Sequence, residues 1–349
     1  MKIGITPFIA ENIAPSNASK LAIFKDEIKV CEVDISRMKP VNLGNKLYSV
    51  GLVSDVHCYS SPVVWNPGTK FDNALTFFEN NGCLFVCNSG DMTQTGFFNE
   101  GDKETLVTAQ FASYKAVCDN HNIPVYELCG NHESYVNPIT NNLTELTEYT
   151  GAEMYYSVSQ GDDAYLFLSQ PKGTIPMSDE ALQWLYETLE CNRNKRCLVF
   201  VHPYISDDSG NALGAYTTNK FFDAWGVKTT VFMSLLSHYK NTLLFHGHSH
   251  MMFECQAVDK SANYTQKNGF KSVHIPSLTR PCAIVNGVRT YQDTKSYGYI
   301  MDIYQNHILL NGFDFVEDKA VPIAQYCIDT TLQTIAPNTY TDDTGTITT

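Results

Sequence analysis

Five short polar motifs occur along the chain, and each directly follows an apolar run that is typical of a buried strand. Their side chains are carboxylates, imidazoles and an amide, which are hard or borderline metal ligands. Ligands of these kinds build sites in which two metal ions act together on a phosphoester. We therefore interpret the motifs as parts of one two-metal hydrolytic centre. In chain order the motifs are Asp55-Val56-His57, Gly90-Asp91, Gly130-Asn131-His132-Glu133, Val201-His202-Pro203 and Gly247-His248-Ser249-His250.

The spacing within the motifs indicates how the ligands converge. Asp55 and His57 are two residues apart, so on an extended backbone both side chains would face the same side. The histidines at positions 248 and 250 share this spacing. We predict that Asp91 bridges two ions. One ion is expected to bind Asp55, His57, Asp91 and His250, and the other Asp91, Asn131, His202 and His248.

The ligand set also predicts the metals and the reaction. Two divalent cations against two carboxylates leave a charge of about +2, or about +1 with a bridging hydroxide, which suits a phosphate ester. Mixed nitrogen and oxygen ligands favour Mn, Fe or Zn over Mg. The hydroxide would attack phosphorus in line with the leaving group. His132 is adjacent to Asn131, so its imidazole can point away from the metals, and we predict it to be the general acid.

The composition is that of a folded, acidic protein. The chain has 349 residues, of which 43% are apolar and 12% aromatic, so it can bury a sizeable core. Its formal net charge of -13 argues against a nucleic-acid backbone or an anionic membrane surface as its main partner. An anionic phosphoester substrate is compatible with this charge because bound cations reverse the local field.

The cysteines and the first residues of the chain bear on the compartment. The eleven cysteines are scattered without a Cys-x-x-Cys pair, which favours a reducing compartment over a disulfide framework. The N-terminal segment lacks the long apolar core of a signal peptide, and no run is long enough to span a membrane. We expect a soluble protein without a membrane partner, located in the cytoplasm or, if it is phage-encoded, in a virion.

From residue 46 onward, apolar runs alternate with segments of helical periodicity. Such alternation is typical of an α/β fold with a parallel sheet and crossover helices. The motifs then lie at the carboxyl ends of strands, where open α/β sheets build their sites. Strands are expected at residues 47–53, 83–87, 123–128, 154–158, 164–168, 197–201, 242–245, 252–258, 282–285, 297–303 and 308–315, with helices at 71–80, 104–120 and 178–190 and within 220–237.

Both ends of the chain fall outside this pattern. Residues 1–45 are predicted to be an N-terminal β extension, with a hairpin formed by residues 20–24 and 28–33. Residues 46–327 are predicted to be the main domain. Residues 328–349 are rich in Thr and Asp and are predicted to be a tail or linker, or an edge strand awaiting a partner. These terminal β segments are candidate surfaces for assembly.

In order and spacing, the motifs resemble those of the calcineurin-like metallophosphoesterase superfamily, whose pattern is D-x-H, G-D, G-N-H-D/E, H and G-H-x-H. The resemblance covers residues 46–315, which is most of the chain. It implies a four-layer α/β/β/α sandwich and the metal-ligand roles for the seven residues named above. The activity that it implies is metal-dependent hydrolysis of phosphomonoesters or phosphodiesters.

Details of the motifs bear on the branch of this superfamily. The segment Gly90-Asp91-Met92-Thr93-Gln94-Thr95-Gly96 resembles the cyclic-nucleotide-phosphodiesterase-like branch. The Ser/Thr protein phosphatase branch would have an Arg after its G-D motif and another before G-N-H-E, where this chain has Cys129. Glu133 departs from the Asp that phosphodiesterase-like members usually carry, and Gln94 stands where many relatives have Asp or Asn.

A second hypothesis comes from the ends of the chain. Residues 14–18 with the following hairpin, together with the Thr-rich end, resemble phosphoesterase-like proteins encoded in phages and prophages. The chain could then be a structural or adhesion component of a phage particle that carries a phosphoesterase-like domain. This hypothesis is compatible with an active enzyme.

The remaining histidines are interpreted differently. A single histidine after a strand is more often a structural residue than a ligand, and this applies to His121, His238, His274 and His307. His246 precedes the last motif and would share a strand face with His248, so a supporting role at the site and a structural role both stay open.

Overall fold

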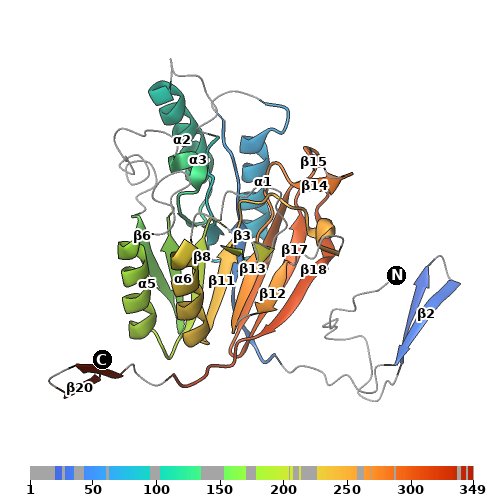
Figure 1. Cartoon of the computed structure of the whole chain (residues 1–349). Helices are drawn as coiled ribbons and strands as arrows, with labels where there is room; N and C mark the ends of the chain where they lie inside the picture. The colour runs from blue at the N-terminus through green and yellow to red at the C-terminus, as the bar shows by residue number, and fades with distance from the viewer. Residues whose placement is uncertain are drawn as a thin grey trace.

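Two six-stranded β-sheets organise the part of the chain that the structure describes (Figure 1). This structure is a computed structural model. It describes residues 20–25, 28–34, 43–59, 63–94, 103–134, 153–169, 178–203, 205–206, 212–213, 226–257, 263–267, 269–286, 288–335, 339–342 and 345–348.

The first sheet contains the strands that lead into the first three motifs, in the order β18-β17-β16-β3-β4-β5. Its strands β3, β4 and β5 run parallel to one another. The antiparallel strands β16, β17 and β18 extend it on the other side of β3. The bounds are β3 Lys46–Val53, β4 Val86–Asn88, β5 Val125–Glu127, β16 Tyr297–Tyr304, β17 His307–Asp314 and β18 Lys319–Asp329.

The second sheet contains the strands that lead into the last two motifs, in the order β12-β13-β11-β8-β7-β6. Its four central strands are parallel, and its two edge strands are antiparallel to their neighbours. The bounds are β6 Tyr155–Gln160, β7 Asp163–Leu168, β8 Arg196–Val201, β11 Thr242–His246, β12 Tyr264–Lys267 and β13 Phe270–His274.

Side-chain alternation along the strands divides the core into three layers. Leu198 and Phe200 of β8 belong to the buried cluster between the two sheets, which also contains Leu52 of β3. Val199, between them on β8, belongs instead to the cluster under two helices. Because both faces of each sheet are covered, the central strands are apolar throughout and not alternately polar.

Helices cover the outer face of each sheet. α1 and α2 pack on the first sheet, where Phe78 of α1 shares a buried cluster with Val53. α5 and α6 cover the second sheet (Figure 1), where Leu185 shares a cluster with Val199. The resulting α/β/β/α sandwich confirms the expected fold class. The helix bounds are α1 Pro67–Asn80, α2 Lys103–Asp119, α3 Asn131–Ser134, α5 Asp179–Cys191 and α6 Gly226–His238.

Helix α5 shows why the local sequence predicts its element. Ser178 is the N-cap, and its Oγ accepts a hydrogen bond from the backbone N–H of Ala181 at 3.1 Å. Asp179 and Glu180 place negative charge in the first turn, where the helix dipole favours it. Leu185 and Leu189 are fully buried, so one face of the helix supplies the apolar contacts to the sheet.

Several expectations about the elements need correction. Both sheets are mixed and not purely parallel, because antiparallel hairpins extend them. The strand expected at residues 252–258 is wrong in its described part: Phe253–Ala257 is a 3-10 helix. The ring of Phe253 packs between Tyr297 and Tyr299, so the apolar residues of this segment serve core packing in a helical turn. Strands β12, β13 and β18 were not expected.

Short hairpins complete the described structure. The predicted hairpin near the N-terminus is confirmed, with β1 Lys20–Lys25 antiparallel to β2 Ile28–Asp34. Near the C-terminus, β19 Thr339–Asp342 pairs with β20 Gly345–Thr348, so this part is a hairpin and not a single edge strand. Each of these two hairpins forms its own two-stranded sheet among the described strands. None of the described helices is both long enough and apolar enough to cross a bilayer. The remaining pairs are β9 Ile205–Ser206 with β10 Ala212–Leu213, and β14 Cys282–Val285 with β15 Val288–Tyr291.

Candidate metal centre

The loops at the carboxyl ends of five strands meet at one place. Backbone hydrogen bonds join neighbouring loops within each sheet: the N–H of Asp55 donates to the carbonyl of Gly90 at 2.9 Å, and that of Gly247 to the carbonyl of His202 at 3.0 Å. A side-chain contact joins the two sheets. The hydroxyl of Ser89, after β4, donates to the carbonyl of Val201 at 2.7 Å. All seven predicted ligands therefore reach this junction: Asp55, His57, Asp91, Asn131, His202, His248 and His250.

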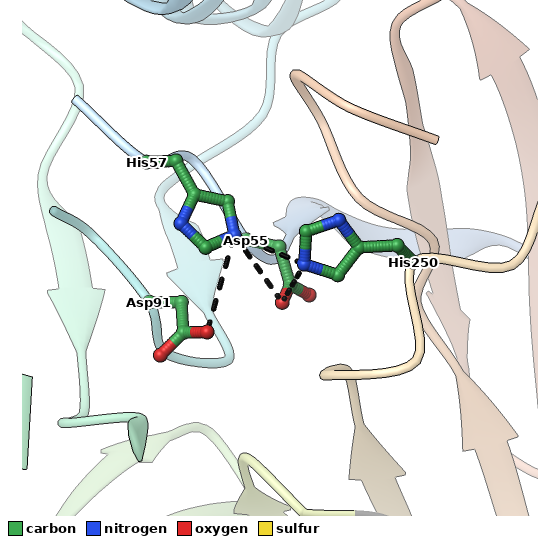
Figure 2. Close-up of side chains that lie close together, drawn as sticks. All are labelled: Asp55, His57, Asp91 and His250. Atoms are coloured by element: carbon green, nitrogen blue, oxygen red, sulfur yellow. Dashed lines mark hydrogen bonds and ion pairs between the residues drawn. The ribbon is translucent and has the colours of Figure 1, made fainter. Parts of the chain in front are cut away.

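The first cluster consists of Asp55, His57, Asp91 and His250, and Figure 2 shows their side chains turned toward one another. Oδ1 of Asp55 lies 3.1 Å from Nε2 of His250, which in turn lies 3.0 Å from Nε2 of His57. Oδ2 of Asp91 lies 3.9 Å from Nε2 of His57. The ligand atoms of all four lie within 4.8 Å of one another, so one ion could contact them all.

The second cluster shares Asp91 with the first and adds His202 and His248. Nε2 of His202 lies 3.1 Å from Oδ2 of Asp91 and 3.1 Å from Nδ1 of His248. Oδ1 of Asn131 also lies 3.1 Å from Nε2 of His202. The Asp91 carboxylate thus stands between two groups of ligands, as a bridging ligand would.

The hydrogen bonds around these side chains fit a bound cation. Nδ1 of His202 bonds to the carbonyl of Ser89 at 2.8 Å, and Nδ1 of His250 to the carbonyl of Arg280 at 3.1 Å. A ring nitrogen beside a carbonyl carries a proton, so Nε2 of each ring is the atom that faces the cluster and could bind a metal ion. Oδ1 of Asp55 is buried without a hydrogen bond among the described residues. Imidazole nitrogens and carboxylate oxygens that converge in this way could hold a positive ion, so the donor set suits the metals that the ligand chemistry predicts.

The backbone at the ligands is left-handed and not extended. The φ angles are 53° at Asp55, 51° at His57, 55° at Asp91, 69° at His248 and 60° at His250. The expectation that an extended backbone turns each pair to one side is therefore wrong, although the ligand atoms converge. Asp and His are tolerated better than most residues in this region, and such conformations concentrate at functional sites.

The comparisons with known proteins agree with this geometry. A family model described as calcineurin-like phosphoesterase matches residues 48–252, which is more than half of the chain. The chain belongs to the calcineurin-like phosphoesterase family. Membership and the ligand clusters together support a metal-dependent phosphoester hydrolase.

Solved structures show the same fold. The phosphoesterase is similar to a dimetal phosphatase of Danio rerio, with 13% identity and a TM-score of 0.56 over 82% of this chain and 100% of that one. It is also similar to a purple acid phosphatase from yellow lupin (Lupinus luteus) seeds, with 13% identity and a TM-score of 0.52 over 83% of this chain and 55% of that one. A comparison with curated protein sequences finds no significant match.

The electrostatics of the phosphoesterase centre favour a cation. Burial alone would raise the pKa of Asp55, but the imidazoles of His250, His202 and His57 hold it well below its ordinary value. Burial lowers the pKa of His57, and that of His248 to about 3, so both rings are neutral. Burial would also lower the pKa of His202, but the carboxylates of Asp91 and Asp55 raise it to about 9. The two carboxylates thus favour a positive charge at this place, which a bound metal ion would supply instead of the proton on His202.

Glu133 has a role that its position in the motif did not reveal. Its Oε2 accepts hydrogen bonds from the backbone N–H of Asp91 at 3.1 Å and of Gly130 at 2.8 Å. Its Oε1 accepts from the N–H and the hydroxyl of Thr93 at 2.8 and 3.0 Å. Burial and the charge of Asp91 raise the pKa of Glu133 to about 7, whereas the four donors favour its ionised form. This carboxylate ties the Asp91 loop to the Gly130 loop.

His132 lies at the edge of the clusters. Its backbone N–H donates to Oδ1 of Asp91 at 2.9 Å, and its Nε2 lies 3.8 Å from Oδ2 of the same carboxylate. Its ring meets that of His57 edge-on, with centroids 4.7 Å apart. The imidazole thus lies closer to the shared carboxylate than an orientation pointing away from the metals would place it. Its role as general acid stays a prediction.

The other histidines occupy structural positions. His246 and His274 are fully buried on the paired strands β11 and β13, with ring centroids 5.5 Å apart. His274 reaches toward the site, because its Nε2 lies 2.8 Å from Oγ of Ser249 in the last motif. His121 instead joins α1 to the end of α2 through Glu79. Only the packing of the fold reveals the contact between His274 and Ser249.

Proposed function

We propose that this protein hydrolyses phosphomonoesters or phosphodiesters with two metal ions held around Asp91. The observation that carries the proposal is the position of the Asp91 carboxylate, whose Oδ2 lies 3.1 Å from Nε2 of His202 and 3.9 Å from Nε2 of His57. One ion would be held by the first cluster, and the second by Asp91, Asn131, His202 and His248. Mn, Fe or Zn suit these mixed nitrogen and oxygen ligands.

The chain's own residues then have distinct tasks. When bound, the ions would supply Lewis acidity to the phosphoryl oxygens and to the attacking water. Ser54 and the N–H of His248 orient Asp55 by donating to its Oδ2 at 2.6 and 3.0 Å, which directs Oδ1 to the cluster. The Ser89 carbonyl orients His202 in the same sense. These contacts set the ligand directions before a substrate arrives, and this saves reorganisation during the reaction.

We assign His132 as the general acid. Water adds to phosphorus in line with the ester oxygen, the bond from phosphorus to that oxygen breaks, and His132 gives its proton to the departing alkoxide. Its position beside Asp91 supports this role, because Nε2 lies 3.8 Å from the carboxylate that both clusters share. At this distance the His132 imidazole would lie close to a phosphoester bound at the metal ions without itself being one of the seven proposed metal ligands.

The test uses purified protein supplied with manganese. We expect turnover of 4-nitrophenyl phosphate or of bis(4-nitrophenyl) phosphate, and a loss of about 100-fold or more in kcat for His132→Ala with unchanged metal content. The loss in kcat should be greater for a phenyl ester than for a nitrophenyl ester, because phenoxide is the more basic leaving group and depends more on protonation. His238→Ala, the same change at the end of α6, serves as the control. Wild-type protein that holds two metals and hydrolyses no phosphoester in a broad panel would sink the proposal.

We propose a phosphoester as the partner of the site, and the acidic charge of the chain disfavours a nucleic-acid backbone. The second candidate, a structural component of a larger particle, is favoured by one observation. The described terminal hairpins β1–β2 and β19–β20 belong to neither large sheet. If they are assembly surfaces, deleting either should lower the number of chains per particle, which size exclusion with light scattering gives as the measured molar mass divided by the chain mass. An unchanged number of chains in both deletions would remove the support for this candidate.

A further inference from the structure

An arginine is held by two aromatic rings beside the metal centre. Cζ of Arg280 lies 4.3 Å from the ring centroid of Trp65 and 4.0 Å from that of Tyr291. Tyr291 in turn lies beside the ligand His250, with ring centroids 6.1 Å apart. A guanidinium contacted by two rings keeps little rotational freedom, so its position is fixed before any ligand binds.

The backbone that carries this arginine is tied to the metal ligands. The carbonyl of Arg280 contacts Nδ1 of His250 at 3.1 Å, and its N–H donates to Oγ of Ser277 at 3.0 Å. The hydroxyls of Ser277 and Thr279 both donate to the carbonyl of Asp55, at 3.0 and 3.2 Å. Arg280 thus sits on a segment with a fixed relation to the first cluster.

A buried lysine ties the same segment to the backbone at residues 293 and 295. Nζ of Lys70 donates to the carbonyls of Thr279, Asp293 and Lys295 at 2.6, 2.7 and 2.7 Å. Lys70 is only 7% exposed, so its ammonium group bonds to these carbonyls and not to solvent. Residues 277–280 are therefore held in place by side-chain hydrogen bonds in addition to the connections of the backbone.

The donors of Arg280 remain available to a ligand. No described residue accepts a hydrogen bond from either terminal nitrogen of its guanidinium. Its Nε lies 3.8 Å from Oδ1 of Asp293, which is an ion pair at a distance too long for a hydrogen bond. The side chain is 25% exposed, so it can be reached from solvent.

These contacts also limit what the ligand can be. Because two rings already contact the guanidinium, a third planar group such as a nucleobase has little room to stack on it. Hydrogen bonds from the N–H groups remain, and their forked geometry matches a phosphate or a carboxylate. In a protein with a net charge of -13, an arginine kept beside the metal site and joined to no carboxylate by a hydrogen bond is a marked local positive charge.

We propose that Arg280 binds a second anionic group of the substrate, a few bonds away from the phosphorus that is attacked. The substrate class is then a phosphoester whose alcohol portion carries a further phosphate or carboxylate. This inference rests on the proposed function, since it names the substrate of the same centre. Trp65 and Tyr291 are positioning residues, because they act through the arginine.

The test measures binding with ligands that cannot be hydrolysed. Calorimetry on metal-loaded protein compares propylphosphonate with propane-, butane- and hexane-bisphosphonates, which add a second anion at increasing distance. We expect at least one bisphosphonate to bind wild-type protein about tenfold or more tightly than the monophosphonate. Arg280→Gln should remove most of this preference. Arg193→Gln should keep it, because Arg193 pairs with Glu190 at the end of α5 and is similarly exposed.

The outcomes separate a binding role from a structural one. A wild-type preference that is absent for every spacer, or that survives in Arg280→Gln, overturns the inference. Equal weakening of mono- and bisphosphonate binding in Arg280→Gln also overturns it, because it would show only that the contact of Arg280 with Trp65 and Tyr291 supports the fold. If Arg280→Gln does not fold, Arg280→Lys decides, since it keeps the charge without the fork and should lower the preference at least about threefold. Turnover of 4-nitrophenyl phosphate, measured separately, tests the proposed function, so the two failures are distinguishable.

Discussion

A Cβ atom at position 130 would lie 2.1 Å from Oδ1 of Asp91, so any residue other than glycine there must displace the carboxylate shared by the two clusters. Gly130 belongs to the motif that follows β5, whereas Asp91 follows β4. The glycine is thus required by the approach of a neighbouring loop. Its neighbour in the motif, Asn131, can be a ligand only because Gly130 lets the two loops touch.

Gly130→Ala should lower metal affinity about 10- to 100-fold, as is usual when the contacts that orient a ligand are disturbed. The reason is the collision with Oδ1 of Asp91, which also accepts the N–H of His132. Titration of metal-free protein with Mn²⁺ measures the change. Gly68→Ala is the matched control, because a Cβ at position 68 meets no atom within 4 Å. Equal affinities in both variants would contradict the packing argument.

Metal stoichiometry should separate the two clusters. Wild-type protein is expected to hold about two ions per chain, as elemental analysis after dialysis would show. His250→Ala removes a ligand of the first cluster alone and should leave about one ion. Asp91→Asn weakens both clusters and should leave fewer than one. A wild-type chain that saturates at one ion would rule out the dinuclear centre.

Glu133→Gln should destabilise both the fold and the metal site. An amide nitrogen cannot accept a hydrogen bond, so donors from Asp91 and Gly130, or both donors of Thr93, would lose their acceptor. The expected cost in free energy of unfolding is about 2 kcal/mol, measured by denaturant unfolding. Glu187→Gln on the exposed face of α5 is the control and should cost far less. A Glu133→Gln protein as stable as the control would show that the carboxylate does not hold these loops.

The contact of His121 with α1 should depend on pH. Nδ1 of His121 lies 2.9 Å from Glu79 and Nε2 lies 3.2 Å from Asp72; burial opposes the charged ring, but these carboxylates raise its pKa in the folded protein. The folded protein then binds the proton more tightly than the unfolded chain, so the stabilisation is complete below the ordinary histidine pKa and is lost as pH rises through the raised value. A double-mutant cycle of His121→Gln and Glu79→Gln should give about 1 kcal/mol of coupling at about pH 5.5 and almost none at about pH 9. A coupling energy that does not change with pH would contradict the charged contact.

The positions of the ligands follow from sequence more directly than their conformations. Each motif comes after an apolar run, and parallel strands end at a common edge, so the meeting of Asp55 and Asp91 is predictable from the order of elements. The approach of His202 is less so, because it follows a strand of the second sheet and depends on how the two sheets stack. The left-handed backbone at these loops is not, because Asp and His occur in many conformations, and contacts such as the burial of Val56 form only in the folded protein. The metal-ligand roles themselves remain predictions until an ion is measured.

The fold shows the same division. Strands that are apolar throughout, such as β8, are predictable because both of their faces are buried. The 3-10 turn at Phe253–Ala257 is not, since its apolar residues satisfy strand and helix patterns equally and the contact of Phe253 with Tyr297 decides between them. Strand β18 has exposed and buried residues in no regular alternation, and pairing with β17 alone defines it.

Five of the seven ligand positions adopt left-handed φ values, at a typical cost of roughly 1–3 kcal/mol each for a non-glycine residue. The total is comparable to the whole free energy of unfolding of an ordinary domain. The packing of the rest of the sandwich must therefore supply additional stability that offsets this strain. Replacing one of the histidines at these positions by glycine would relax the backbone and stabilise the polypeptide while removing an atom that could bind a metal ion. Improvement in heat resistance and retention of ions should therefore pull in opposite directions at these positions.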